Sequence, residues 1–76
     1  MITYKNLGRD SGVIQYDISE SAIEVMFKDR MIYLYTYQSA GREIIENMKR
    51  LATTGIGLNS YISRIVKTRF FSKRRG

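Results

Sequence analysis

Hydrophobic and polar residues alternate along much of the first half of the chain, which is typical of β-strands with one buried face. Polar, turn-forming residues separate three such runs: Val13–Ile18 (VIQYDI), Ala22–Lys28 (AIEVMFK) and Met31–Tyr37 (MIYLYTY). In the first run, Ile14, Tyr16 and Ile18 are expected on one face. Short alternating runs joined by tight turns predict an antiparallel meander. A short extra strand is expected at Ile2–Tyr4.

The hydrophobic period then changes to that of a helix. Ser39 is a suitable N-cap, and Gly55 is expected to end the helix. Between them the apolar residues follow helical spacing: Ile44, Ile45, Met48, Leu51 and Ala52. We therefore predict a first amphipathic helix after the strands.

A second helix is predicted after the Gly55-Ile-Gly57 turn. Its apolar residues recur at i, i+3, i+4, i+7 and i+8: Leu58, Tyr61, Ile62, Ile65 and Val66. Arg64 and Lys67 fall on the opposite face, and Asn59 is placed to cap the helix. The element order predicts an α+β fold: a three-stranded antiparallel β-meander followed by two helices packed on one face (β-β-β-α-α). We expect one domain over residues 1–69 and a basic C-terminal end over residues 70–76.

The orientation of the tyrosines in MIYLYTY depends on the turn that precedes them. A two-residue turn at Asp29-Arg30 buries Ile32 instead and leaves Tyr33 and Tyr35 on the outer face. A three-residue loop, Lys28-Asp29-Arg30, puts Val25 opposite Tyr33 and turns the tyrosines towards the core. A slip of one residue interchanges these outcomes.

We favour the three-residue loop because it needs a positive φ only at Arg30, whereas a type I′ turn needs it at both central residues. The tyrosines are then mainly structural. The opposite face would expose Met26, Ile32 and Leu34, an apolar patch suited to a protein partner or a weak homodimer.

Charge divides the chain into two halves. Residues 1–46 contain five basic and seven acidic side chains, whereas residues 47–76 contain eight basic side chains and no acidic one. A net charge of −2 therefore precedes a net charge of +8. Such a basic half indicates a polyanionic partner, either nucleic acid or an anionic surface, although a solubilising tail gives the same pattern.

The residue types argue against catalysis. The chain has no histidine and no cysteine, which removes the commonest acid–base groups, thiol nucleophiles and the usual zinc ligands. We expect no enzyme activity, no metal and no cofactor. The N-terminal sequence MITYKNLGRD has no apolar signal region, and no apolar run reaches the ~20 residues of a membrane span. A cytoplasmic protein without membrane insertion is expected.

Four short motifs resemble the KTSC domain, a small module found at the C-terminus of some lysyl-tRNA synthetases and as a stand-alone bacterial protein. They are Tyr16-Asp17, Ile23-Glu24-Val25-Met26-Phe27, Tyr33-Leu34-Tyr35 and the segment GIGLNSYI, which carries Gly55 and Asn59. The resemblance covers residues 11–65, but this chain has Arg30 where the family commonly has glycine. It implies an α+β fold and structural roles for these motif residues, and RNA binding has been suggested for the family.

The favoured function is therefore a small non-catalytic module that binds RNA, or another polyanion, through its basic half. The candidate phosphate-binding residues are Lys49, Arg50, Arg64, Lys67, Arg69, Lys73, Arg74 and Arg75. The alternative is a protein-interaction or adaptor module that uses the sheet face and has no nucleic-acid role. Phe70 and Phe71 either dock on the core or stay exposed, where an aromatic ring would stack on bases.

Overall fold

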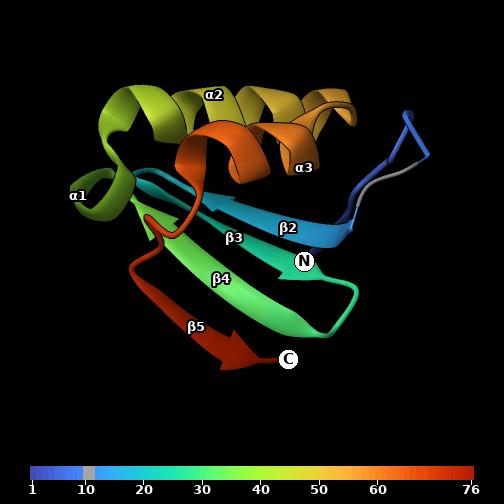
Figure 1. Ribbon diagram of the computed structural model, residues 1–76, viewed down its shortest axis with the longest axis horizontal. Helices are drawn as coiled ribbons and strands as arrows, with labels where there is room; N and C mark the ends of the chain where they lie inside the picture. Colours follow the sequence, from blue (N-terminus) through green and yellow to red (C-terminus); the bar gives the residue numbers. More distant parts are fainter. Residues whose placement is uncertain (10–11) are drawn as a thin grey trace.

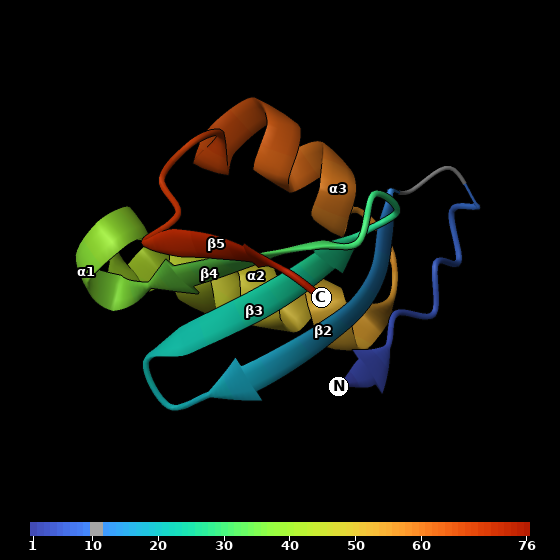
Figure 2. The same cartoon turned by 90° about the horizontal axis from the view of Figure 1, so that it is seen from below.

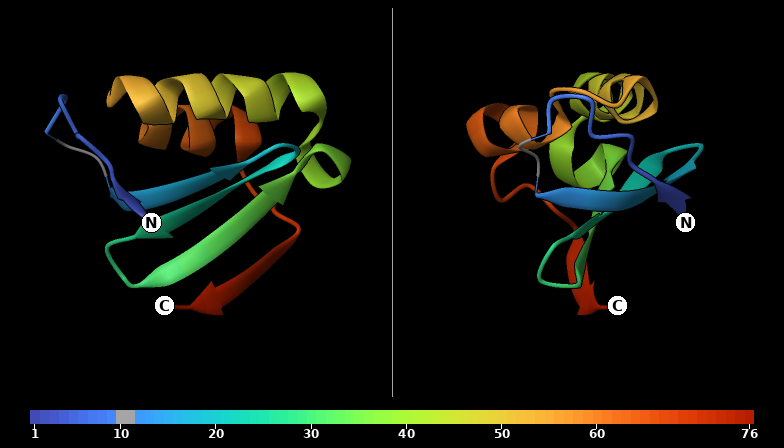
Figure 3. Two further views of the ribbon diagram at one scale, coloured as in Figure 1. Left: turned by 180° about the vertical axis from the view of Figure 1, so that it is seen from behind. Right: turned by 90° about the vertical axis from the view of Figure 1, so that its right-hand side faces the viewer.

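The computed structural model describes residues 1–9 and 12–76 (Figure 1). Its strands and helices are, in chain order, β1 (Ile2–Thr3), β2 (Val13–Ser19), β3 (Ala22–Phe27), β4 (Met31–Thr36), α1 (Tyr37–Ala40), α2 (Arg42–Thr54), α3 (Leu58–Tyr61), the π-helical η1 (Ile62–Val66) and β5 (Ser72–Arg75). The strands form one antiparallel sheet in the order β1-β2-β3-β4-β5. The two long helical segments, α2 and α3–η1, lie together on one face of it (Figures 1 and 3).

The α+β fold and the central meander agree with the sequence analysis, but the sheet has more strands than the predicted three. β1 lies within the expected segment Ile2–Tyr4. β5 was not expected, because Ser72–Arg75 had been assigned to the basic end of the chain. These residues pair antiparallel with β4 along Met31–Leu34, so the C-terminal residues complete the sheet (Figure 2).

The β3–β4 hairpin has the three-residue loop that the sequence analysis favoured. Val25 pairs with Tyr33 and Ile23 pairs with Tyr35. Arg30 has a φ of 71°, and its amide donates to the carbonyl of Phe27 at 2.9 Å. This register turns the tyrosines towards the helices: Tyr35 is only 2% exposed, and Tyr33 is half-buried against the core.

The apolar patch predicted on the outer face is not exposed. Met26 is 8% and Ile32 only 4% exposed, and Leu34 is half-buried. The cause is the unexpected strand β5, whose pairing with β4 carries the chain end over this face. The Gly76 amide donates to the Arg30 carbonyl at 2.7 Å. A Cβ atom at Gly76 would lie 2.8 Å from both Ile32 Cδ1 and Met26 Cε, so the chain end covers both side chains.

A bulge in β2 changes which residues of the first alternating run face the core. The register with β3 shifts between Val13 and Gln15, which places Val13 and Tyr16 in the core, although they are three residues apart. Ile14 is half-buried at the bulge, and Ile18 is 36% exposed near the end of the strand. The expected face is therefore wrong for Ile14, because a bulge inserts one extra residue and breaks strict alternation. Tyr16 and Ile18 still share one face, where they pair with Val25 and Ile23.

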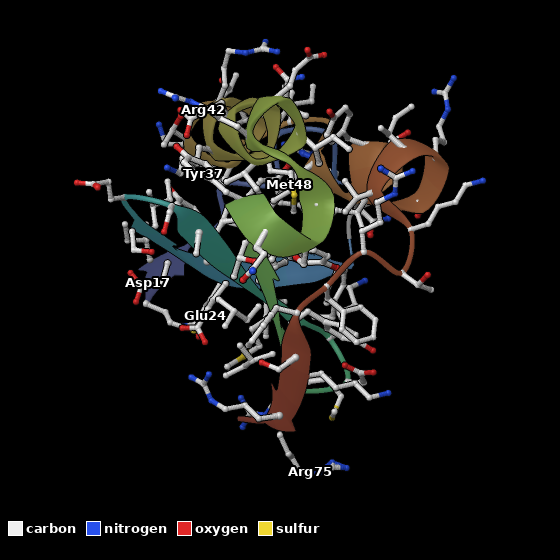
Figure 4. All side chains as sticks on the ribbon, turned by 90° about the vertical axis from the view of Figure 1, so that its left-hand side faces the viewer. Asp17, Glu24, Tyr37, Arg42, Met48 and Arg75 are labelled. Carbon is white, nitrogen blue, oxygen red and sulfur yellow. The ribbon has the colours of Figure 1, made fainter. Side chains whose placement is uncertain are left out.

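The first predicted helix is divided into two parts. Thr36, not Ser39, is the N-cap of α1, and the two side chains form a reciprocal capping box. Gly41, with a φ of 98°, then separates α1 from α2. Gly55 ends α2 as predicted, in a left-handed conformation with a φ of 89°. Met48 points from α2 into the space between the helices and the sheet (Figure 4).

The second predicted helix begins at Leu58, but its last turn is π-helical. The Lys67 amide donates to the carbonyl of Ile62, five residues earlier, at 2.6 Å. The wider turn keeps Ile62 and Val66 buried and rotates Ile65 outwards, where it is 50% exposed. The predicted burial of Ile65 is therefore wrong, because that prediction assumed α-helical spacing through residue 66.

Helices and sheet enclose one hydrophobic core. Its most deeply buried side chains are Val13, Ile23, Val25, Tyr35, Ile45, Met48, Leu58 and Val66. They come from the inner face of the sheet, from α2 and from the α3–η1 segment, so each of these elements needs the others to bury its apolar face.

Candidate nucleic-acid interface

The predicted phosphate-binding cations do not lie on one surface. Lys49 and Arg50 belong to α2, whereas the other six follow the chain from η1 through a connecting segment into β5. In the part of the chain that the structure describes, the ion pairs are Lys49–Glu46 and Arg74–Glu24. Lys49 and Arg74 are therefore already neutralised by a carboxylate within the domain, whereas the other cations of the second half have no such partner among the residues that the structure describes.

Lys49 is held by contacts within the domain. Its Nζ donates to the carbonyl of Glu20 at 2.7 Å and to Glu46 Oε2 at 3.0 Å, and it lies 5.4 Å from the ring centroid of Tyr37. The Tyr37 hydroxyl also donates to Glu46, at 2.5 Å, and this hydrogen bond raises the pKa of Tyr37 and lowers that of Glu46. Lys49 thus joins α2 to the β2–β3 turn rather than standing free for a ligand.

Arg50 has one partner on its own helix. Its guanidinium donates to Asn47 Oδ1 at 3.1 Å, and the side chain is otherwise exposed on α2. Arg50 and Lys49 both belong to α2, whereas the other six cations lie in the later segment from η1 to β5.

Arg64, Lys67 and Arg69 are exposed and have no carboxylate partner among residues 1–9 and 12–76. Arg64 projects from η1, and Lys67 follows directly where the π-helical turn ends, with a φ of 52°. Arg69 lies in the segment that leads to β5. Single π-helical turns are rare and are found frequently at functional sites.

The three cations of β5 are divided between the two faces of the sheet. Lys73 pairs with Tyr33 and lies on the helix side, where its Nζ is 6.0 Å from the Tyr33 ring centroid and 5.9 Å from that of Phe70. Arg74 lies on the other face and forms an ion pair with Glu24. Arg75 alternates back to the side of Lys73, at the far end of β5 from the helices (Figure 4).

Two phenylalanines precede β5 and have different surroundings. The Phe70 ring packs edge-on against Tyr33, with 4.9 Å between centroids, and against Tyr35. Phe71 is 62% exposed. In sequence, this exposed aromatic ring lies between Arg69 and Lys73, which are both exposed and have no carboxylate partner in the described ranges.

The residues of the motifs that resemble the KTSC domain have identifiable structural surroundings. Tyr33 and Tyr35 pack in or against the core, and burial raises the pKa of Tyr35 to about 12, with a smaller contribution from Tyr33. Gly55 supplies the left-handed end of α2. Asn59 differs from expectation, since no side-chain hydrogen bond caps α3. Its half-buried amide instead lines a surface hollow beside Arg64.

The described residues offer neither a cluster of metal ligands nor a membrane-spanning helix. They contain no group of three acidic, histidine or cysteine side chains placed to hold a metal ion. None of the helices in the described ranges is both long and apolar enough to cross a bilayer.

Comparison with known proteins gives no matching family model, no matching curated protein and no matching solved structure.

Proposed function

We propose that the chain is a non-catalytic module that binds single-stranded RNA across the surface between η1 and β5. The observation that carries the proposal is a run of exposed cations, without carboxylate partners in the described chain, that flanks an exposed aromatic ring along the chain from η1 to β5. This basic surface consists of Arg64, Lys67, Arg69, Phe71, Lys73 and Arg75.

The two kinds of side chain have separate roles. Lysine and arginine neutralise phosphates and release counterions, which supplies affinity without sequence preference. Phe71 offers a face on which an unstacked base can stack, and base–aromatic stacking contributes ~1–3 kcal/mol per base. A single strand exposes its phosphates and its base faces at once. It therefore suits this surface better than a duplex, whose bases are already stacked.

The proposal narrows the set of phosphate-binding residues that the sequence suggested. Lys49 and Arg74 already have carboxylate partners, and Arg50 lies on α2, so these three are secondary contributors. The KTSC resemblance and a cytoplasmic location are compatible with RNA binding and stay hypotheses. The alternative adaptor function loses its main support, because Met26 and Ile32 are covered on the outer face.

Fluorescence anisotropy with a short labelled single-stranded RNA tests the proposal. We expect a dissociation constant of about 10⁻⁶ M near physiological salt, with affinity that falls steeply as salt rises. The double variant Lys67→Gln/Arg69→Gln should weaken binding and reduce the slope of log K against log salt by about 1–2. The matched control Arg42→Gln/Arg50→Gln removes equal charge from α2 and should have a smaller effect.

Phe71→Ala separates stacking from charge. It should weaken binding by about tenfold while the salt slope stays unchanged, because it removes a stacking contact and no cation. Equal losses in the two double variants would point to net charge rather than to this surface. An absence of binding to RNA at low salt would reject the proposal and favour an acidic protein partner.

A further inference from the structure

Two hollows adjoin along α3 and η1, beside the basic surface. The first, of about 370 Å³, lies between the N-terminal segment at residues 4–8 and the side chains of Asn59, Ser60, Ser63 and Arg64. The second, of about 430 Å³, is lined by Leu51, Tyr61 and Ile65. Both contain Gly57, Ser60 and Arg64 in their walls, so the two hollows adjoin along these residues, and we call the pair the groove. Each is near the lower end of the ~300–1,000 Å³ range of small-molecule sites.

Four polar side chains in the wall of the first hollow have no partner within the described chain. Asn59, Ser60, Ser63 and Arg64 make no side-chain hydrogen bond or ion pair with the described chain. No carboxylate from residues 1–9 or 12–76 lines the hollow. One guanidinium, two hydroxyls and an amide can therefore all donate to an anion.

The wall opposite these donors is fixed in place. The Leu58 amide donates to the buried hydroxyl of Tyr4 at 3.2 Å. The Leu7 amide donates to the carbonyl of Gly55 at 2.7 Å. These bonds join the N-terminal segment to the turn between α2 and α3, and the views agree that this segment runs past the start of α3 (Figures 2 and 3). The hollow is therefore formed before a ligand arrives.

The second hollow is largely apolar. Tyr61 is half-buried, and its hydroxyl accepts a hydrogen bond from Asn47 Nδ2 at 3.2 Å, which fixes the ring. Ile65 is 50% exposed because the π-helical turn rotates it out of the core. Together with Leu51 they form the apolar part of a wall that Arg64 also lines.

We infer that this groove holds one nucleotide of the bound strand, with its phosphate among Arg64, Ser60 and Ser63 and its base against Tyr61 and Ile65. A nucleotide is the component of RNA that combines an anion with a flat, largely apolar ring, and the groove places the matching groups side by side. The inference rests on the proposed RNA-binding function, and it adds a built site to an otherwise sequence-independent surface.

Titration of the isotope-labelled protein with small probes, followed by amide NMR shifts, tests the site directly. Uridine 5′-monophosphate should shift the amides of Ser60, Ser63 and Arg64 and also those of Tyr61 and Ile65. Inorganic phosphate should shift only the first group, and uridine only the second. Shifts centred on β5 for all three probes, or no shifts, would overturn the inference.

A charge-preserving variant distinguishes a built site from general attraction. Arg64→Lys keeps the charge but loses the planar fork that binds phosphate oxygens in pairs. It should weaken RNA binding by about tenfold, whereas the matched control Arg69→Lys should change it by less than about twofold. Ile65→Ser, at an exposed position, should weaken binding of uridine 5′-monophosphate but not of phosphate.

The outcomes for the groove and for RNA binding in general are distinguishable. Wild-type affinity for RNA in Arg64→Lys and Ile65→Ser would reject the groove and leave the basic surface intact. Failure of the unmodified protein to bind the RNA strand would reject the proposed function. Binding of free uridine 5′-monophosphate without binding of the strand would assign the groove to a mononucleotide and overturn its role in RNA binding.

Discussion

The two faces of the sheet are covered by very different parts of the chain. The inner face, with Tyr35 and Val25, lies under α2 and the α3–η1 segment (Figure 1). The outer face has no helix over it, yet Met26 and Ile32 are almost as well buried, because pairing of β5 with β4 brings Gly76 against both side chains. Alternation in a strand assigns residues to faces, but it does not reveal which distant segment covers each face.

Because different segments cover the two faces, substitutions on each face should cost different amounts of folding stability. Many fixed neighbours surround Tyr35, which contacts Tyr33 and Phe70 and lies within the central cluster. Ile32 depends on one four-residue strand whose own side chains are all exposed. Inner-face substitutions should therefore disrupt the whole domain, whereas outer-face substitutions should report on the docking of β5.

The largest effect is expected for Tyr35→Ala on the inner face. Removal of a ring that is 2% exposed should cost about 3–5 kcal/mol, the range for large aromatic truncations. Urea melts followed by circular dichroism measure this change. Tyr33→Ala should cost less, because that side chain is only half-buried. Losses below about 1 kcal/mol for both variants would contradict the register of the hairpin, because a slip of one residue moves both rings to the outer face.

Alkaline pH should lower the stability of the folded protein through ionisation of Tyr35. Its pKa is about 12 in the folded protein and 10.0 in the reference state, so ionisation favours unfolding. The stability contributed by neutral Tyr35 is complete below about pH 10 and falls by about 2–3 kcal/mol as pH rises to 12. Tyr35→Phe should lose this part of the pH dependence in urea melts. Parallel pH profiles for the two proteins would contradict the assignment.

Ile32→Ala should report on the outer face with a smaller effect. We expect a cost of about 2 kcal/mol, the low end for aliphatic truncations, because the covering strand can adjust. The same substitution in a chain lacking residues 72–76 should cost less than about 1 kcal/mol, since Ile32 would already be exposed. Equal costs in both chains, measured by urea melts, would show that β5 does not cover this side chain.

The smallest effect is expected for the ion pair on the outer face. Arg74 is 59% and Glu24 23% exposed at the side chain, so Arg74→Ala should cost less than about 1 kcal/mol. A double-mutant cycle with Glu24→Gln, at low and high salt, measures the coupling. A coupling that exceeds the cost of Ile32→Ala would mean that charge rather than apolar contact holds β5 in place.

Local chemistry explains which parts of the fold the sequence could predict. The three strands, the left-handed residues Arg30 and Gly55 and the inward tyrosines all follow from neighbouring residues. The bulge at Ile14, the π-helical turn at Ile65 and the pairing of β5 do not, because tertiary packing decides them. In β5, the sequence SKRR has none of the apolar alternation that identifies a strand.

The candidate site was predictable only in part, for a similar reason. Charge counting finds every cation in the second half but cannot distinguish Lys49, which the Glu20 carbonyl and Glu46 hold, from Arg69, which has no carboxylate partner. Ser60 and Ser63 gave no signal at all. Their importance comes from the N-terminal segment, which closes the hollow from more than fifty residues away in sequence.

The position of β5 at the edge of the sheet also bears on aggregation. An open edge strand can pair with the edge of another molecule and extend the sheet into a fibre. Here the edge strand carries Lys73, Arg74 and Arg75 in succession, so a second copy paired edge to edge would bring two basic strands together. The same residues that complete the fold thus discourage sheet growth between copies, and high salt, which screens this repulsion, is the condition under which that protection is weakest.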